Sequence, residues 1–378
     1  MASVCVQGTL DSLFTRLYPE GRRTPNAMSA ELTHRCNFGC PHCYCRLPQD
    51  GPTPRAELST EQWKRIISEA VNEGVLFALF TGGEPLLRED FRELWRFGRE
   101  RGLINILFTN GSLIDAKMAD FLAEWTPRQI SVTLYGATEE TYRQMTGQRG
   151  MHQRALEAVD LLRERGLPLD VRSIITRTNR HEVPALREQS ARYQKIFMWD
   201  AELIGSYPTG QGHPASVRLS AQELFDIEYE DEVRLAEWHK MVAAWKPAPP
   251  QPDYPFRCGV LKSEFHLDPY GGLHPCLGLE SISLDLLHMS VHEAWEALPE
   301  ALLPVIGEPG PCQSCGLPPI CRQCPADALL EGKPAGWPLP ERCEMARLRA
   351  EAFGLPPPPT CAAGAKQTFV DNDSGANI

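Results

Sequence analysis

The sequence predicts an α/β fold built on a parallel sheet and followed by a cysteine-rich region. Strand-like and helix-like segments alternate from residue 27 to residue 246, polar motifs stand where the strand-like segments end, and the composition changes at the proline-rich "KPAPPQPDYPF". A chain of 378 residues with 42% hydrophobic composition is long enough for two domains. We expect an N-terminal extension (1–26), an α/β domain (27–246), a cysteine-rich domain (247–350) and a flexible proline-rich tail (351–378).

Six strand–helix units follow one another along the α/β domain. The first helix begins at about Thr60, with a threonine suited to the N-cap and with Trp63, Ile66, Ile67 and Ala70 along one face. Periodicity alone leaves both a doubly wound sheet and a partial barrel open, and both place their chemistry at the carboxyl ends of the strands. Strands are predicted at 27–33, 75–80, 104–109, 129–135, 169–175 and 196–204, and helices from about 60, near 88–101, near 115–125, from about 138 to 165, near 181–194 and near 220–246.

The composition indicates the cellular compartment of the protein and the kinds of ligand it binds. The N-terminus has no apolar run of signal-peptide length and no segment approaches a membrane span, which predicts a cytoplasmic protein. Thiols stay reduced there, so thirteen cysteines indicate metal ligands or catalytic groups rather than disulfides. The net charge of −11 with scattered Lys and Arg argues against a nucleic-acid surface.

The stretch "ELTHRCNFGCPHCYC" places Cys36, Cys40 and Cys43 in a C-x3-C-x2-C pattern directly after the first strand. A structural zinc ion takes four protein ligands, whereas a 4Fe-4S cluster held by three cysteines leaves one iron for an outside ligand. The spacing therefore indicates an iron-sulfur cluster. A zinc loop completed by Cys45 or His42 is the alternative.

These residues resemble the radical S-adenosylmethionine (SAM) superfamily. "CNFGCPHC" after the first strand and "TGGEP" (81–85) after the second carry the resemblance, which "TNG" (109–111), "SVTLYGATEETYRQMTG" (131–147) and "IITRTN" (174–179) extend. It implies a partial (βα)6 TIM-like barrel whose 4Fe-4S cluster, reduced by a donor such as flavodoxin or ferredoxin, cleaves SAM to methionine and a 5′-deoxyadenosyl radical. That radical abstracts hydrogen from the substrate.

The resemblance also implies roles for individual residues in SAM binding. Gly82, Gly83 and Glu84 match the motif that meets the methionine amino group, since glycines permit close backbone approach and a carboxylate pairs with an ammonium. Thr133 matches a position that touches the ribose, with Ser131 as second choice. Arg143 is a candidate for the methionine carboxylate, and a surface helix arginine is its equally weighted alternative.

The later cysteines resemble the SPASM extension of this superfamily, which carries two auxiliary Fe-S clusters. Two residues, rather than the three of that pattern, separate the last two thiols of "CQSCGLPPICRQC". A pair of zinc knuckles is the alternative, and Cys5, Cys45 and Cys361 fall outside the scheme. The resemblance implies a cluster nearer the substrate on Cys258, Cys276 and Cys324, with no fourth ligand identified, and a distal cluster on Cys312, Cys315, Cys321 and Cys343.

SPASM enzymes commonly modify peptides, so the resemblance implies maturation of a ribosomal peptide through a thioether or carbon–carbon crosslink or a similar modification. Leu277 stands where sulfatase-maturing relatives have an aspartate, which disfavours that activity. Only about 26 residues precede the first strand, so we expect any leader peptide to be bound by a separate protein. The alternatives are modification of a tetrapyrrole or another small metabolite and, from another class, a zinc-stapled binding protein.

Overall fold

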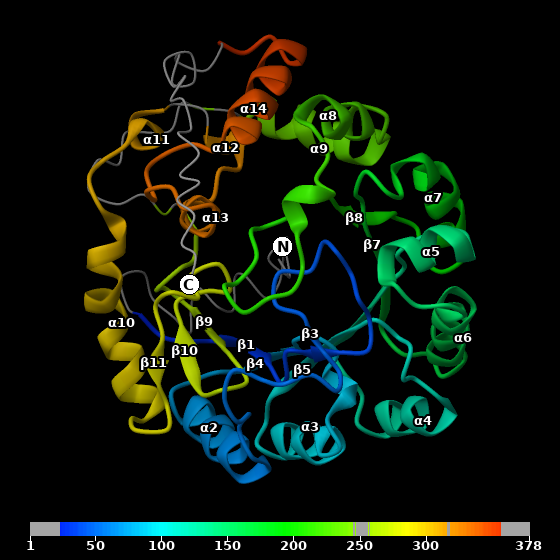
Figure 1. Ribbon diagram of the computed structural model, residues 1–378, viewed down its shortest axis with the longest axis vertical. Helices are drawn as coiled ribbons and strands as arrows, with labels where there is room; N and C mark the ends of the chain where they lie inside the picture. Colours follow the sequence, from blue (N-terminus) through cyan, green and yellow to red (C-terminus); the bar gives the residue numbers. More distant parts are fainter. Residues whose placement is uncertain (1–22, 245, 247–255, 257, 316–317, 357–378) are drawn as a thin grey trace, which may run out of the picture. The chain divides into compact units, whose positions relative to one another are not determined.

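The computed structural model, drawn in Figure 1, describes residues 23–244, 246, 256, 258–315 and 318–356. These residues belong to two compact units. The first unit takes its described residues from Met1–Leu219, Phe256–Val305 and Leu329–Lys333, and the second from Ser220–Pro255, Ile306–Ala328 and Pro334–Ile378. Cys5, Cys361 and most of the predicted N-terminal extension and tail lie outside the described residues. No helix in the described ranges is both long and apolar enough to span a membrane.

Six parallel strands form the centre of the first unit. Neighbours in the sheet are also neighbours in the chain, because each strand pairs in parallel with the next. A doubly wound sheet would reverse its order at a switch point, so this order selects the partial barrel between the two predicted architectures. The strands are β1 (Ala27–Glu31), β4 (Phe77–Thr81), β5 (Ile104–Thr109), β6 (Gln129–Thr133), β7 (Leu169–Ile174) and β8 (Met198–Asp200).

Helices follow these strands and lie along one side of the sheet (Figure 1). The first of them buries the predicted apolar face, with Trp63, Ile66 and Ile67 at 0% exposure. Its N-cap is Ser59 rather than the expected Thr60, because the Ser59 hydroxyl accepts from the Gln62 amide and completes a capping box. The helices are α2 (Thr60–Asn72), α3 (Phe91–Glu100), α4 (Ala116–Glu124), α5 (Glu139–Thr146), α6 (Met151–Glu164) and α7 (Val183–Ala191).

Three strands from the cysteine-rich part of the sequence extend this sheet. β9 (Glu264–Leu267) pairs in parallel with β1, and β10 (Gly272–His274) and β11 (Leu284–Asp285) continue outward in antiparallel register. The sequence indicated little regular structure here, since strands of two to four residues leave almost no periodic signal. Helix α10 (Val291–Ile306) follows.

The second unit is helical. The single acidic helix expected near 220–246 is two helices, α8 (Ala221–Tyr229) and α9 (Glu232–Ala243). The break falls at Asp231, whose carboxylate caps α9 by accepting from the Arg234 amide. α11 (Pro311–Ser314), α12 (Pro318–Cys321), α13 (Pro325–Leu330) and α14 (Pro340–Ala352) carry or flank the later cysteines.

Candidate active site

The loop with Cys36, Cys40 and Cys43, called here the cysteine loop (residues 32–46), begins where β1 ends. Its two limbs are joined by a short parallel pair, β2 (Arg35–Cys36) and β3 (Leu47–Pro48), with Cys36 opposite Pro48. The Leu47 amide also donates to the His34 carbonyl at 2.8 Å. The thiols therefore project from a loop whose ends are fixed by backbone hydrogen bonds.

The predicted Gly82 and Gly83 pack directly against the cysteine loop. The Gly83 amide donates to the Thr33 carbonyl at 2.7 Å. A Cβ on Gly82 would overlap that same carbonyl oxygen, and one on Gly83 would lie 2.6 Å from the His34 carbonyl. Gly82 also has φ +135, which favours glycine. Both glycines are thus required for two loops to meet backbone to backbone.

Glu84 is fully buried beneath this contact. Its carboxylate accepts from the Thr109 hydroxyl and the Asn110 amide, each at 2.8 Å, and from the Leu86 amide at 3.1 Å. Burial raises the pKa of Glu84 to about 7, although these hydrogen bonds act to lower it. The "TNG" motif therefore holds the carboxylate that the resemblance assigns to the SAM amino group.

Two asparagines connect the same motif to the first thiol, and sequence reasoning did not single them out. The Asn110 side-chain amide donates to Asn37 Oδ1 at 3.0 Å and lies 3.9 Å from Cys36 Sγ. Asn37 in turn donates to the Ser112 hydroxyl at 2.8 Å. The sequence did offer a signal for this contact, because Asn37 directly follows Cys36 and Asn110 stands in the strand-end motif "TNG".

The segment after β8 covers the cysteine loop from another direction. The Tyr207 amide donates to the Tyr44 carbonyl at 2.9 Å, and the His213 amide to the Pro41 carbonyl at 2.7 Å. A Cβ on Gly212 would overlap the Cys43 carbonyl oxygen. This contact was also missed, although the glycines of "PTGQGHP" were a visible signal.

The three thiols suit a metal cluster better than a single ion. Burial raises the pKa of Cys36 to about 12. Burial also raises the pKa of Cys40, and the nearby Cys36 and Cys43 raise it further. In contrast, a hydrogen bond from Cys45 lowers the pKa of Cys43 to about 7. One tetrahedral zinc holds its sulfurs under about 4 Å apart, since each Zn–S bond is about 2.3 Å. Among the described residues, the donor group within 4.8 Å is Glu31, His34 and Cys45, not these thiols. The three sulfur atoms of Cys36, Cys40 and Cys43 are thus spaced more widely than one zinc ion allows, which fits a 4Fe-4S cluster, whose cysteines bind different irons.

Strand β6 places the predicted ribose contacts near the same end of the sheet. Ser131 is 2% exposed, and within the described chain its hydroxyl has no hydrogen-bond partner. Thr133 is the half-buried last residue of the strand. A buried hydroxyl without a partner is costly, so it fits a site that a polar ligand fills. His42 is half-buried with its ring 5.5 Å from that of Tyr135, and desolvation lowers its pKa to about 4.

Arg143 is paired with Glu140 rather than with the other residues predicted to bind SAM. It lies on α5, and its guanidinium donates to the Glu140 carboxylate at 2.6 and 3.1 Å. With 39% of the side chain exposed, this is a surface ion pair. Its assignment to the methionine carboxylate stays a prediction, and it would require Arg143 to leave Glu140.

The later cysteines are divided between the two units. Cys258 and Cys276 belong to the first unit, and the other five to the second. In the second unit, burial raises the pKa of Cys321 to about 11, with a further contribution from the nearby Cys315. The four thiols predicted for the distal cluster, Cys312, Cys315, Cys321 and Cys343, therefore share one unit, and Cys324 belongs to it as well.

Comparison with known proteins matches this arrangement to a family. The family model described as the radical SAM superfamily matches residues 30–189. A PqqA peptide cyclase of Granulibacter bethesdensis is 30% identical over 323 residues, which cover 81% of this chain and 84% of that enzyme. An AdoMet-dependent heme synthase of Methanosarcina barkeri is 28% identical over 217 residues, or 56% of this chain and 61% of that enzyme.

A solved structure shows the same fold at lower identity. Streptococcus suis SuiB bound to the precursor peptide SuiA matches with a TM-score of 0.62 and 18% identity, over 83% of this chain and 74% of that one. The chain belongs to the radical SAM superfamily of enzymes.

Proposed function

We propose that this enzyme abstracts a hydrogen atom from a peptide and forms a thioether or carbon–carbon crosslink, or a similar modification, within it. The observation that carries the proposal is the match to a PqqA peptide cyclase along 84% of that enzyme's length. The fold shared with SuiB, whose structure holds a precursor peptide, supports it.

Within the active site, Cys36, Cys40 and Cys43 would hold a 4Fe-4S cluster that, with SAM, supplies reductive cleavage and hydrogen-atom abstraction. The chain's own groups orient the cofactor. Gly82 and Gly83 let backbone reach it, and the Glu84 carboxylate pairs with its ammonium group. Ser131 and Thr133 offer hydroxyls to the ribose, and Arg143 is assigned to the carboxylate.

We assign the remaining thiols to two auxiliary Fe-S clusters. Cys312, Cys315, Cys321 and Cys343 supply four ligands from one unit, whereas Cys258, Cys276 and Cys324 supply three. The implied partners are a separate protein that binds any leader peptide and a reduced flavodoxin or ferredoxin as electron donor. We place the reaction in the cytoplasm, where these thiols stay reduced.

Cluster ligation is tested by two cysteine variants of the anaerobically reconstituted protein. Cys40→Ala is expected to abolish 5′-deoxyadenosine formation, because it removes a ligand of the SAM cluster. Cys324→Ala is the matched control, and it should lose about four irons of one auxiliary cluster while still cleaving SAM. Undiminished 5′-deoxyadenosine from Cys40→Ala, or full iron content in Cys324→Ala, would contradict the ligand assignment.

The substrate class is tested by mass spectrometry. The enzyme is incubated with SAM, dithionite and a small cysteine- or aromatic-rich peptide encoded beside its gene. A product lighter by two hydrogen atoms, absent without SAM, is expected for a crosslink. An iron coproporphyrin is the parallel substrate, because the heme synthase match favours a tetrapyrrole as the second candidate. Conversion of the porphyrin and not the peptide would reverse the proposal.

A further inference from the structure

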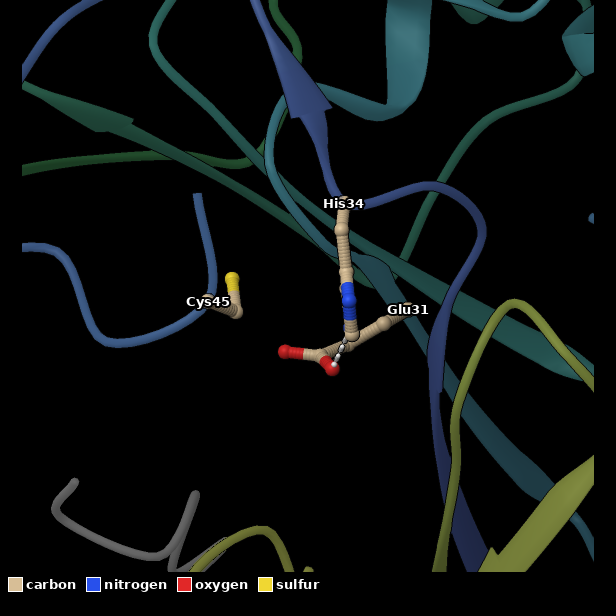
Figure 2. Close-up of side chains that lie close together, drawn as sticks. All are labelled: Glu31, His34 and Cys45. Carbon is tan, nitrogen blue, oxygen red and sulfur yellow. Dashed lines mark hydrogen bonds and ion pairs between the residues drawn. The ribbon is translucent and has the colours of Figure 1, made fainter. Parts of the chain in front are cut away.

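A second group of metal-binding side chains lies beside the three cluster thiols. Glu31 ends β1, His34 stands three residues later, and Cys45 lies on the far limb of the cysteine loop. Their donor atoms lie within 4.8 Å of one another. All three are buried, with exposures of 0%, 3% and 0%. Figure 2 shows the His34 ring directed at the Glu31 carboxylate, with Cys45 on a separate stretch of the loop.

Strand register fixes the carboxylate at the centre of this group. Glu31 Oε2 lies 2.8 Å from His34 Nε2 and 3.2 Å from His266 Nε2, and the Tyr44 hydroxyl donates to Oε1 at 2.7 Å. His266 is positioned by the β1–β9 pairing, which sets it opposite Ser29. Its other ring nitrogen, Nδ1, hydrogen-bonds to the Ser29 hydroxyl at 2.7 Å.

The hydrogen bonds within this group do not use all of its donors and acceptors. In the described part of the chain, His34 Nδ1 and His266 Nε2 are buried and have no hydrogen-bond partner. His266 Nε2 faces the Glu31 carboxylate without an aligned hydrogen bond. His266 Nε2 is still within ion-pair distance of Glu31, so His34 Nδ1 is the nitrogen of this group that has no partner in the described chain. Buried polar atoms are nearly always satisfied, so this nitrogen indicates that the group is incomplete without a ligand.

The donor set identifies the class of ligand. A carboxylate, an imidazole and a thiolate form a mixed oxygen, nitrogen and sulfur set, which suits zinc or ferrous iron and disfavours magnesium or calcium. Three protein donors leave one position of a tetrahedral ion open. The Ser29 and Tyr44 hydrogen bonds to His266 and Glu31 resemble the outer partners that orient metal ligands.

We propose that Glu31, His34 and Cys45 bind one divalent transition metal ion, for which Zn²⁺ is the probe, separately from the cluster on Cys36, Cys40 and Cys43. His266 stands beside this set and holds the Glu31 carboxylate in place. The ion joins the end of β1 to the far limb of the cysteine loop.

The test uses the protein with its iron-sulfur clusters reconstituted, exposed to one equivalent of Zn²⁺ and desalted. Metal analysis should find about one zinc per chain, and X-ray absorption at the zinc edge should show one sulfur at about 2.3 Å with nitrogen and oxygen at about 2.0–2.2 Å. An absence of bound zinc would overturn the proposal. A shell made only of sulfur would overturn it too, because it would place zinc on cluster thiols.

Two variants complete the test. Glu31→Gln should lose the zinc while its iron content stays that of the wild type. The matched control is His274→Gln, which removes a buried histidine that is also paired with a carboxylate, Asp268 at 3.0 Å, but belongs to no three-donor group among the described residues. It should keep its zinc. Zinc retained by Glu31→Gln, or lost equally from both variants, would contradict the proposed site. If Glu31→Gln fails to fold, the X-ray absorption spectrum of the wild-type protein tests the proposal instead.

Discussion

A buried ion pair in the second unit is the most informative place to perturb the proposed distal cluster. Arg349 and Glu228 are 1% and 3% exposed, and they join α14 to α8, which lie side by side (Figure 1). Two guanidinium nitrogens of Arg349 donate to Glu228 at 2.9 and 3.0 Å, and the third donates to the Ile320 carbonyl at 2.7 Å. The guanidinium also lies 4.3 Å from the Trp238 ring centroid. Ile320 immediately precedes Cys321.

The substitution Arg349→Met removes the cation and leaves the carboxylate buried. Removal of one partner from a buried pair costs about 3–5 kcal/mol, because the remaining charge is uncompensated. Arg234 lies 3.5 Å from the same carboxylate and would supply partial compensation, which favours the lower end of that range. We therefore expect a loss of about 3 kcal/mol in the free energy of unfolding of the second unit. That is a large part of the 5–15 kcal/mol that stabilises a typical domain.

The assay is urea unfolding followed by tryptophan fluorescence, together with iron analysis of the reconstituted protein. The double variant Glu228→Leu/Arg349→Met should recover most of the stability, since an apolar pair of similar volume leaves no buried charge. The single variant should lose about four irons and still form 5′-deoxyadenosine. A single variant within about 0.5 kcal/mol of the wild type, or a double variant as unstable as the single, would refute the reasoning.

Three further predictions concern the first unit. Gly212→Ala should lower 5′-deoxyadenosine formation about 100-fold, because its Cβ would displace Cys43. The control Gly39→Ala should not lower it, because the added Cβ would meet its nearest atom at 3.5 Å. Equal effects of the two substitutions would contradict this account. The pKa of Glu84 is about 7, so its carboxyl becomes neutral as the pH falls below 7 and pairs less well with an ammonium. SAM affinity measured by calorimetry should therefore rise with pH up to about 7 and then level off, and Glu84→Gln should be flat; a pH-independent wild type would argue against the pairing. Ser59→Ala should cost about 1 kcal/mol in thermal unfolding, since it removes the cap of α2, and an unchanged midpoint would show that the cap contributes nothing.

Much of the barrel could be predicted because its signals are long and local. The six parallel strands and the helices between them carry apolar repeats of several residues, and their order along the sheet is their order in the chain. The strand-end position of the cysteines and of "TGGEP" followed from the same reasoning. Because parallel strands end at one edge, the cysteines, "TGGEP" and "TNG" were expected at the same end of the sheet.

What sequence reasoning missed depends on contacts between segments far apart in the chain. β9 is four residues long, and only its pairing with β1 makes it a strand of this sheet. In the sequence, Gly212 resembles an ordinary turn glycine, and its role becomes visible in the fold, where the Cys43 carbonyl lies against it. Cys45 read as an incidental thiol because nothing local to it reveals Glu31 and His34 as its neighbours.

Main-chain hydrogen bonds from three other segments hold the cysteine loop, in addition to its side-chain contacts. The segments around Gly83, Leu47 and Tyr207 each bond to it through backbone amides, at 2.7, 2.8 and 2.9 Å. Except at the close contacts that require Gly82, Gly83 and Gly212, main-chain bonds depend on backbone position rather than on side-chain identity, which is consistent with SuiB sharing this fold at 18% identity. The hydrogen bonds that hold this loop can therefore be kept in chains of different sequence.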